Sequence, residues 1–241
     1  MIQVETLRPL VTVTIDRPER RNALDRAAVE ELLAAVEAVP QDTRVLVLTG
    51  AAGHFCAGAD LGGVEDPVFK AGLATLLERL RHAPFVTLAA VEGAALGAGT
   101  QLAVACDLRL ATPTASFGIP AAKLGLAVDV RTVQMLASLA GHGPARAMLL
   151  AAEVVRGDEA HRLGLVQRLG TLEDARAWAA DIATLAPLTI QAHKVALHAL
   201  EPAADHDAAV QDSVGRAWAS ADAQEGVTAF HERRRPAFHG R

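Results

Sequence analysis

The sequence predicts an α/β fold in which strands and helices alternate over the first half of the chain and helices dominate the second half. Apolar stretches of strand length recur up to residue 112, and nearly every segment after residue 132 has helical periodicity. Of the 241 residues, 51% are hydrophobic and 21% are charged, so the chain can bury a sizeable core. One large domain, or one domain with an appendage, is therefore expected.

Strand and helix patterns follow one another along the first half. Residues 27–39 and 73–82 have the helical period, and Pro84 marks the end of the second helix. Four further stretches predict strands, namely residues 11–16, 44–50, 85–91 and 107–112. The rhythm has a spacing of roughly 35–45 residues, which suggests stacked similar units, although no sequence repeat is visible.

The second half favours helices almost throughout. The helical segments are residues 133–140, 143–152, 158–165, 172–186, 189–200 and 204–232. No linker rich in serine or glycine separates the two halves, so we expect the helices to follow directly on the α/β core.

Composition excludes several classes of function. A net charge of −5 gives no basic surface for nucleic acid. Two cysteines, Cys56 and Cys106, do not make a disulfide framework, which fits a reduced, cytoplasmic setting. The first residues lack the pattern of a signal peptide. The most apolar stretch, 85–106, contains Glu92 and Gln101, so we interpret it as a buried strand and helix, not a membrane span.

Common catalytic and metal motifs are missing from the sequence. It contains no dinucleotide-binding glycine motif, no P-loop and no nucleophile elbow. His193 and His198 are five residues apart, which is the wrong spacing for a shared metal on one helix face. We therefore expect no metal site.

Two loops of small residues remain as candidate binding sites. One is HFCAGADL (54–61), which follows the predicted strand 44–50, and the other begins GAGTQ (97–101), after the predicted strand 85–91. Ligands bind beyond the carboxyl ends of strands in layered α/β folds. One N–H from each loop can converge on an oxygen and form an oxyanion hole. The alternative is that small residues only allow tight packing of strand against helix.

Four stretches carry a specific resemblance. FCAGADL (55–61), GAALGAGTQLAVACDLRLAT (93–112), FGIPAAKLGLAVDV (117–130) and AFHERRRPAF (229–238) resemble the crotonase, or enoyl-CoA hydratase/isomerase, superfamily. The resemblance covers nearly the whole chain in order. It implies a spiral core of ββα units, here residues 1–185, and a helical C-terminal region, here 186–241, that forms trimers which often pair into hexamers.

The resemblance also implies a ligand and the residues that hold it. The ligand is a coenzyme A thioester, and no separate cofactor is expected. The thioester oxygen lies between the backbone N–H groups of Ala59 and Ala98, the second of which is commonly glycine in the family. The matching positions along CoA are Arg21, Ala23, Leu24, Ala57, Asp60 and Leu61, with Phe230 and Arg233 reaching the CoA of a neighbouring subunit.

This chain departs from the hydratases of the family at both of their glutamates. Gln101 occupies one glutamate position and Ala121 occupies the other. A glutamine cannot accept a proton from water and an alanine cannot even orient it, and loss of such a group typically costs about 10²–10⁴-fold in rate. Whether the chain is an enzyme is therefore open, although the family label would be hydratase or isomerase.

One acid remains nearby, and it has two interpretations. Asp129 aligns with an aspartate that resembles the base of dienoyl-CoA isomerases and the nucleophile of chlorobenzoyl-CoA dehalogenases. Asp129 also precedes the apolar run 130–140, where an aspartate caps a helix N-terminus. We favour the cap, and we expect Lys123 to pair with this carboxylate.

The sequence therefore predicts a crotonase-fold protein of lipid metabolism that binds fatty acyl-CoA with little or no hydratase activity. Three alternatives stay open: an enoyl- or dienoyl-CoA isomerase with Asp129 as base, an enoyl-CoA hydratase, and a structural subunit that holds a partner enzyme of lipid metabolism.

Overall fold

The computed structural model describes residues 1–200 and 208–240, and its main sheet has six strands. Their order across the sheet is β1 (Ile2–Leu7), β2 (Leu10–Ile15), β3 (Val45–Gly50), β4 (Val86–Val91), β6 (Leu108–Ala111) and β9 (Arg168–Leu169). β1 runs antiparallel to β2, and all other neighbours are parallel. The four predicted strands are confirmed as β2, β3, β4 and β6. The prediction missed β1, a mostly exposed edge strand without a continuous apolar run.

A second sheet accounts for the stacked units. It contains β5 (Ala94–Leu96), β7 (Ser116–Gly118) and β8 (Val154–Arg156). Single-residue bridges join Cys56 to Ala95 and Leu24 to Ala59, so the loop after β3 extends this sheet. Successive units therefore place one segment in each sheet before a helix follows, which confirms the predicted ββα rhythm. Strands of three residues are too short to show a period, and β8 lies inside the half that was predicted to be helical.

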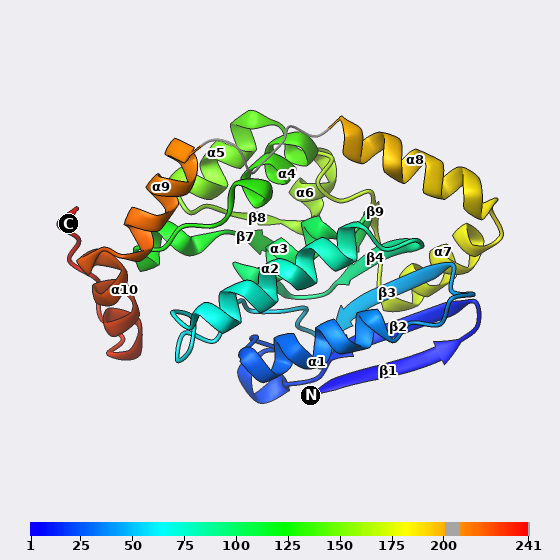
Figure 1. Ribbon diagram of the computed structural model, residues 1–241, viewed down its shortest axis with the longest axis horizontal. Helices are drawn as coiled ribbons and strands as arrows, with labels where there is room; N and C mark the ends of the chain where they lie inside the picture. Colours follow the sequence, from blue (N-terminus) through cyan, green and yellow to red (C-terminus); the bar gives the residue numbers. More distant parts are fainter. Residues whose placement is uncertain (201–207, 241) are drawn as a thin grey trace.

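Helices cover both faces of the main sheet (Figure 1). α1 (Arg26–Glu37), α2 (Pro67–Arg81) and α3 (Ala98–Ala105) pack on one face, and α7 (Leu172–Ala183) packs on the other. Leu46 and Leu48 of β3 belong to the first buried cluster, whereas Val45 and Val47 belong to the second. Burial on both faces explains why residues 44–50 show an apolar run and no alternation.

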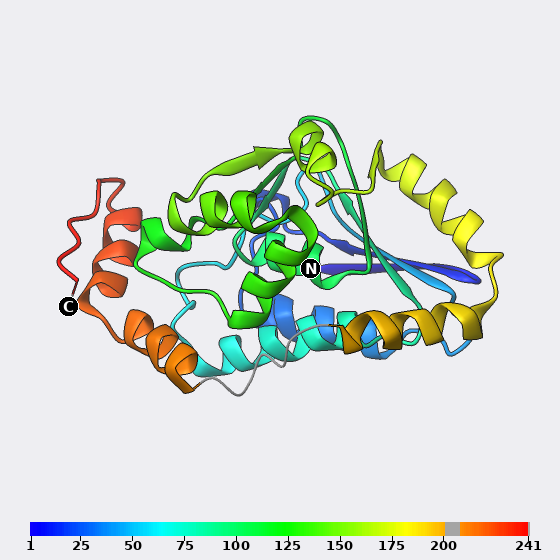
Figure 2. The same cartoon turned by 90° about the horizontal axis from the view of Figure 1, so that it is seen from above.

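The second half is helical, as predicted, apart from its short strands. Its helical elements are η2 (Pro120–Leu124), α4 (Val130–Ala140), α5 (His142–Leu150), α6 (Gly157–Arg162), α7, α8 (Pro187–Ala199), α9 (Ala208–Trp218) and α10 (Ala221–His231). Residues 204–207 of one predicted segment lie outside the described residues. The boundary expected after residue 185 falls between α7 and α8. α8 and α10 lie at opposite ends of the molecule (Figures 1 and 2).

Both ends of the C-terminal region attach to the chain's own core. At one end, Lys194 of α8 donates from Nζ to the carbonyl of Phe85 at 2.8 Å and to Asp107 Oδ2 at 2.7 Å. At the other end, Trp218 of α9 donates from Nε1 to the carbonyl of Ala127 at 2.8 Å. Within the described ranges, no helix is long and apolar enough to cross a membrane.

Candidate active site

Helix α3 begins with backbone N–H groups that the helix itself cannot satisfy. Gly97 is the N-cap residue, with φ of 53°, a conformation that glycine adopts easily, and it supplies no side chain to cap the helix. The first N–H groups, beginning with that of Ala98, carry the positive end of the helix dipole. Ala98 itself is 4% exposed. This helix start therefore offers donors in a largely dry environment.

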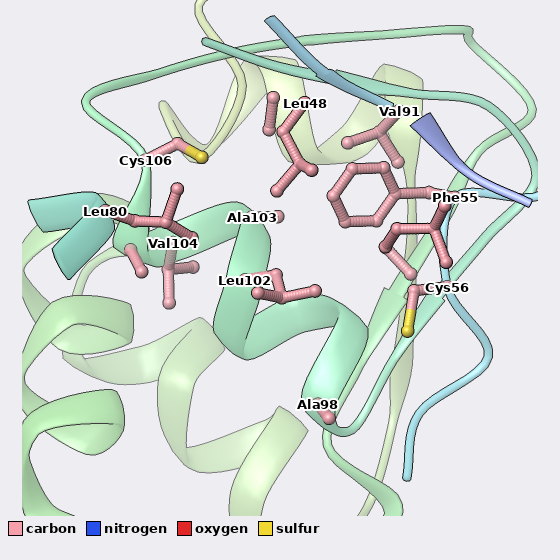
Figure 3. Close-up of a cluster of buried hydrophobic side chains, with 14 of the residues drawn as sticks. Leu48, Phe55, Cys56, Leu80, Val91, Ala98, Leu102, Ala103, Val104 and Cys106 are labelled. Carbon is pink, nitrogen blue, oxygen red and sulfur yellow. The ribbon is translucent and has the colours of Figure 1, made fainter. Parts of the chain in front are cut away.

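The two small-residue loops meet at this helix start. A Cβ on Gly99 would lie 2.1 Å from the carbonyl oxygen of Cys56, and a Cβ on Gly58 would lie 3.9 Å from the nitrogen of Ala98. Figure 3 shows Ala98 at the start of α3, with Cys56 on the neighbouring segment. Glycine is therefore required at position 99 because the backbones touch, and the predicted approach of the two loops is found.

The N–H of Ala59 is directed toward the same region. Leu24 donates from N to the carbonyl of Gly58 at 2.8 Å and accepts from the N–H of Asp60 at 2.7 Å. Ala59 lies between the two residues of this bridge that bond to Leu24. Its N–H therefore points away from Leu24, to the side where β5 and the start of α3 lie. Among the described residues, neither the N–H of Ala59 nor that of Ala98 donates a hydrogen bond. The arrangement fits the predicted oxyanion hole, whose use by a ligand stays a prediction.

The residues predicted to lie along CoA form two adjacent segments. η1 (Pro18–Arg20) ends at Arg21, whose carbonyl accepts from the N–H of Ala57 at 3.0 Å. Arg21 has an exposed side chain, and Leu24 is fully buried in its bridge to the second segment. The structure thus brings together the six predicted positions of this chain, which are Arg21, Ala23, Leu24, Ala57, Asp60 and Leu61.

Asn22 holds these two segments together, although the sequence analysis predicted no role for it. Its Nδ2 donates to the carbonyls of Ala51 at 2.9 Å and His54 at 2.5 Å, and its Oδ1 accepts from the N–H of Arg17 at 2.8 Å. An asparagine at positive φ in a polar turn is the signal that marks such a residue.

Gln101 and Asp129 are joined by a hydrogen bond. The Gln101 Nε2 donates to Asp129 Oδ2 at 2.8 Å and to Thr132 Oγ1 at 3.1 Å. Asp129 is the N-cap of α4, because its Oδ1 accepts from the N–H of Thr132 at 2.8 Å, which confirms the predicted cap. The Thr132 hydroxyl donates to Asp129 Oδ2 at 2.6 Å. Thr132, another residue without a predicted role, completes this network.

A pocket of about 210 Å³ contains this network. Its walls come from α2, α3, the start of α4 and Gln211 of α9, and they include Leu77, Gln101, Val104, Asp129 and Met135. Gln101 is 9% exposed, whereas Asp129 is largely exposed at the pocket wall. The structure therefore brings Gln101, which was predicted at a glutamate position of the hydratases, and Asp129, the remaining acid, into one pocket.

The sequence analysis also singled out two residues of η2, Ala121 and Lys123. Ala121 lies on η2, partly buried against the main apolar cluster, and it is not one of the residues that line the pocket. Lys123 of the same 3₁₀ helix donates from Nζ to the carbonyl of Ala152 at 3.0 Å. The predicted pair of Lys123 with Asp129 is therefore wrong, because η2 directs this lysine to the residues that follow α5.

Phe230 and Arg233 lie far along the chain, at the end of the molecule formed by α10 (Figure 1). Phe230 is 59% exposed and stacks edge-on against His231, with ring centroids 6.0 Å apart. Arg233 is exposed just beyond α10. Contact of these residues with the CoA of a neighbouring subunit stays a prediction.

Arg109 fixes the far end of α3 and was missed by the sequence analysis. This fully buried arginine donates to the carbonyls of Ala103 at 3.1 Å, Cys106 at 2.7 Å and Leu165 at 2.6 Å. A cation at a helix C-terminus is favourable, and its hydrogen bonds offset the cost of burying it. An arginine between two leucines in a predicted buried strand is the signal that could have identified it.

A second hollow, of about 310 Å³, lies at the amino ends of β3 and β4. Its walls include Arg44, Phe85, Leu185, Leu188 and Gln191. The candidate loops follow the carboxyl ends of these strands, so this hollow is separate from the candidate site. None of the predicted site residues lines it.

Comparison with known proteins agrees with the fold. Residues 5–241 match the family described as enoyl-CoA hydratase/isomerase. The protein of Mycobacterium tuberculosis named probable enoyl-CoA hydratase echA6 is 43% identical over 242 residues, which cover 100% of both chains. The 2,3-dehydroadipyl-CoA hydratase of Escherichia coli is 35% identical over 244 residues, 96% of each chain.

The crystal structure of a methylmalonyl-CoA decarboxylase has a TM-score of 0.90 to this chain, covering 100% of it and 98% of the other chain. At 22% identity, that similarity shows the fold alone. The chain has the crotonase fold and belongs to the enoyl-CoA hydratase/isomerase family.

Proposed function

We propose that this protein binds fatty acyl-CoA thioesters and hydrates enoyl-CoA slowly or not at all. The observation that carries the proposal is the hydrogen bonding of the side chain at position 101. The amide of Gln101 stands there, with both of its N–H groups directed to Asp129 and Thr132. A neutral amide that is engaged in this way cannot take a proton from water.

Binding requires only groups that the chain retains. The thioester oxygen accepts from the backbone N–H groups of Ala59 and Ala98, and these donors are independent of the side chains at 101 and 121. The adjacent segments that carry Arg21 and Ala57 offer a path for the rest of CoA. The relatives are named as hydratases of enoyl-CoA and 2,3-dehydroadipyl-CoA, which supports a CoA thioester as the ligand.

A second candidate function is isomerisation by proton transfer at Asp129. It is favoured because the Asp129 carboxylate lines the same pocket as Gln101. Three donors already converge on this carboxylate, from Gln101 and from the N–H and hydroxyl of Thr132. Because they occupy most of its lone pairs, we rank isomerisation below simple binding.

We also propose that the protein forms a homotrimer or a hexamer. An exposed apolar surface supports this part of the proposal. It lies at α8 and just before it, and consists of Leu185, Leu188, Val195, Leu197 and Leu200, each more than half exposed. Apolar side chains gathered in this way mark an interaction surface in soluble proteins.

One set of measurements on the purified protein tests the proposal. We expect a long-chain acyl-CoA to raise the melting temperature more than free CoA does, because the acyl chain adds buried apolar area. We expect crotonyl-CoA to be hydrated negligibly under the same conditions. Equal shifts with both ligands, or no shift with either, would contradict binding in this pocket. Turnover close to that of an ordinary family hydratase would contradict the loss of activity.

A further inference from the structure

Arg17 is a buried arginine just after β2, and it holds the segment that carries Leu24. Its Nη1 donates to the carbonyl of Ala23 at 2.5 Å, and its Nη2 donates to Asp25 Oδ2 at 2.5 Å. The Arg17 side chain is only 10% exposed. A planar guanidinium holds two acceptors at once in a fixed geometry. Arg17 therefore fixes the residues on both sides of Leu24.

Asp25 connects this ion pair to helix α1. Its Oδ1 accepts from the N–H of Ala28 at 2.9 Å, which makes Asp25 the N-cap of the helix. One carboxylate thus binds the guanidinium with one oxygen and the helix start with the other. Because α1 packs on the main sheet through its buried face, the carboxylate is held in place relative to the sheet.

Leu24 in turn holds the residues on both sides of Ala59. Its N–H donates to the carbonyl of Gly58 at 2.8 Å, and its carbonyl accepts from the N–H of Asp60 at 2.7 Å. The Ala59 N–H lies between these two hydrogen bonds and points away from Leu24. A displacement of Leu24 therefore displaces the Ala59 N–H as well.

The burial of the Arg17 guanidinium is better explained by geometry than by stability. A buried ion pair adds little net stability compared with apolar residues of the same volume. A backbone donor that must meet a ligand oxygen, however, has to be held to within about 0.5 Å by the residues around it. The hydrogen bonds from Arg17 to Ala23 and Asp25 supply such a constraint.

We propose that Arg17 is a positioning residue for the thioester carbonyl. Together with Asp25 it sets the place of Leu24, and through Leu24 it sets the direction of the Ala59 N–H. Arg17 itself does not contact the ligand, and no covalent step is involved. The inference rests on the proposed function, because it assumes that the thioester oxygen lies between Ala59 and Ala98.

The test compares two ligands of one chain length, an acyl-CoA thioester and the corresponding S-alkyl-CoA thioether. The thioether lacks the carbonyl oxygen, so it cannot use the two N–H donors. Calorimetry gives both dissociation constants for the wild type and for Arg17→Met, whose side chain has no donor. We expect the wild type to bind the thioester about tenfold more tightly, and this ratio to fall toward one in Arg17→Met. A general disturbance of the CoA segments weakens both ligands alike and leaves the ratio unchanged.

Two further variants serve as matched controls. Arg17→Lys keeps the charge but replaces the planar fork by a single ammonium, so it should restore only part of the ratio. Lys194→Met breaks another buried ion pair, at 2.7 Å from Asp107, which follows the far end of α3 from Ala98. It should lower the melting temperature and leave the ratio at the wild-type value.

The infrared stretching frequency of the bound thioester carbonyl gives a readout that a change in stability alone does not move. Hydrogen bonds from N–H groups lower this frequency, so it should rise in Arg17→Met. A ratio and a frequency that both stay at their wild-type values in Arg17→Met would overturn the inference and leave the proposed function intact. Where Arg17→Met does not fold, an unchanged ratio in Arg17→Lys overturns it. If neither ligand binds the wild-type protein, the proposed function fails, and the inference fails with it.

Discussion

At position 101 the chain holds an amide whose best partner is the carboxylate of Asp129, 2.8 Å away. A glutamate in the same place would put two carboxylates within hydrogen-bond distance, where both cannot remain ionised at low cost. A neutral amide at position 101 therefore avoids the repulsion that a second carboxylate would cause beside Asp129. Gln101 and Asp129 therefore form one local arrangement.

The role of Asp129 can be measured by exchange of protons with solvent. We expect the wild-type protein to incorporate no deuterium from heavy water into a 3-enoyl-CoA, because three donors hold the carboxylate. Asp129→Asn is the matched control, since asparagine keeps the size of the side chain and also caps helices well. Mass spectrometry of the recovered ligand reads the result. Exchange in the wild type that disappears in Asp129→Asn would identify Asp129 as a base.

At the scale of single elements, α3 is the helix that assembles the candidate site. Its start touches the loop after β3 at Gly99, its middle carries Gln101, and its end is held by Arg109. Leu102 and Ala103 of the same helix point into the buried cluster around Leu48 (Figure 3). Packing of the apolar face therefore fixes where the polar face lies.

The substitution Gly99→Ala tests this contact. A Cβ at position 99 would lie 2.1 Å from the Cys56 carbonyl oxygen, so α3 and the loop must separate. We expect a loss of stability of about 1–3 kcal/mol, as for other overpacked sites, together with loss of acyl-CoA binding. Gly63→Ala is the control, because nothing lies within 4 Å of its added Cβ. Unchanged affinity in Gly99→Ala would disprove the close approach of the two loops.

At the scale of the whole molecule, two sheets and the helices around them enclose one large apolar cluster that reaches both ends of α3. Cys56 and Cys106 lie in this cluster, 0% and 2% exposed, and they are near opposite ends of the helix in Figure 3. Burial raises the pKa of each thiol to about 12. Both thiols should therefore stay protonated and inert in the folded protein.

Thiol labelling gives a measure of the integrity of this core. In native buffer at pH 8 we expect neither cysteine to react with iodoacetamide within the time that denatured protein needs for complete labelling. Above the ordinary thiol pKa of 9.0, unfolded cysteines lose their protons while the folded ones keep them. The free energy of unfolding should then fall as the pH rises toward 12. Rapid labelling of the native protein would mean that the core opens.

The sequence by itself determined those features that depend on local pattern or on a long ordered set of motifs. Four strands of the main sheet (β2, β3, β4 and β6), the helical second half and the Asp129 cap were predictable, because hydrophobic periodicity and a cap over three residues are local properties. The family was also predictable, because its motifs extend over nearly the whole chain. The short strands β5, β7 and β8 were not, since three residues show no period.

Only the tertiary structure decided which partners the polar groups take. Gln101 meets Asp129 across 28 residues, Lys194 meets Asp107 across 87, and Lys123 turns to Ala152 instead of Asp129. These pairings depend on how helices pack against the sheets and on the need to satisfy every buried polar group. No local pattern contains that information, so the contact between Gln101 and Asp129 could be found only from the packing of α3 against α4.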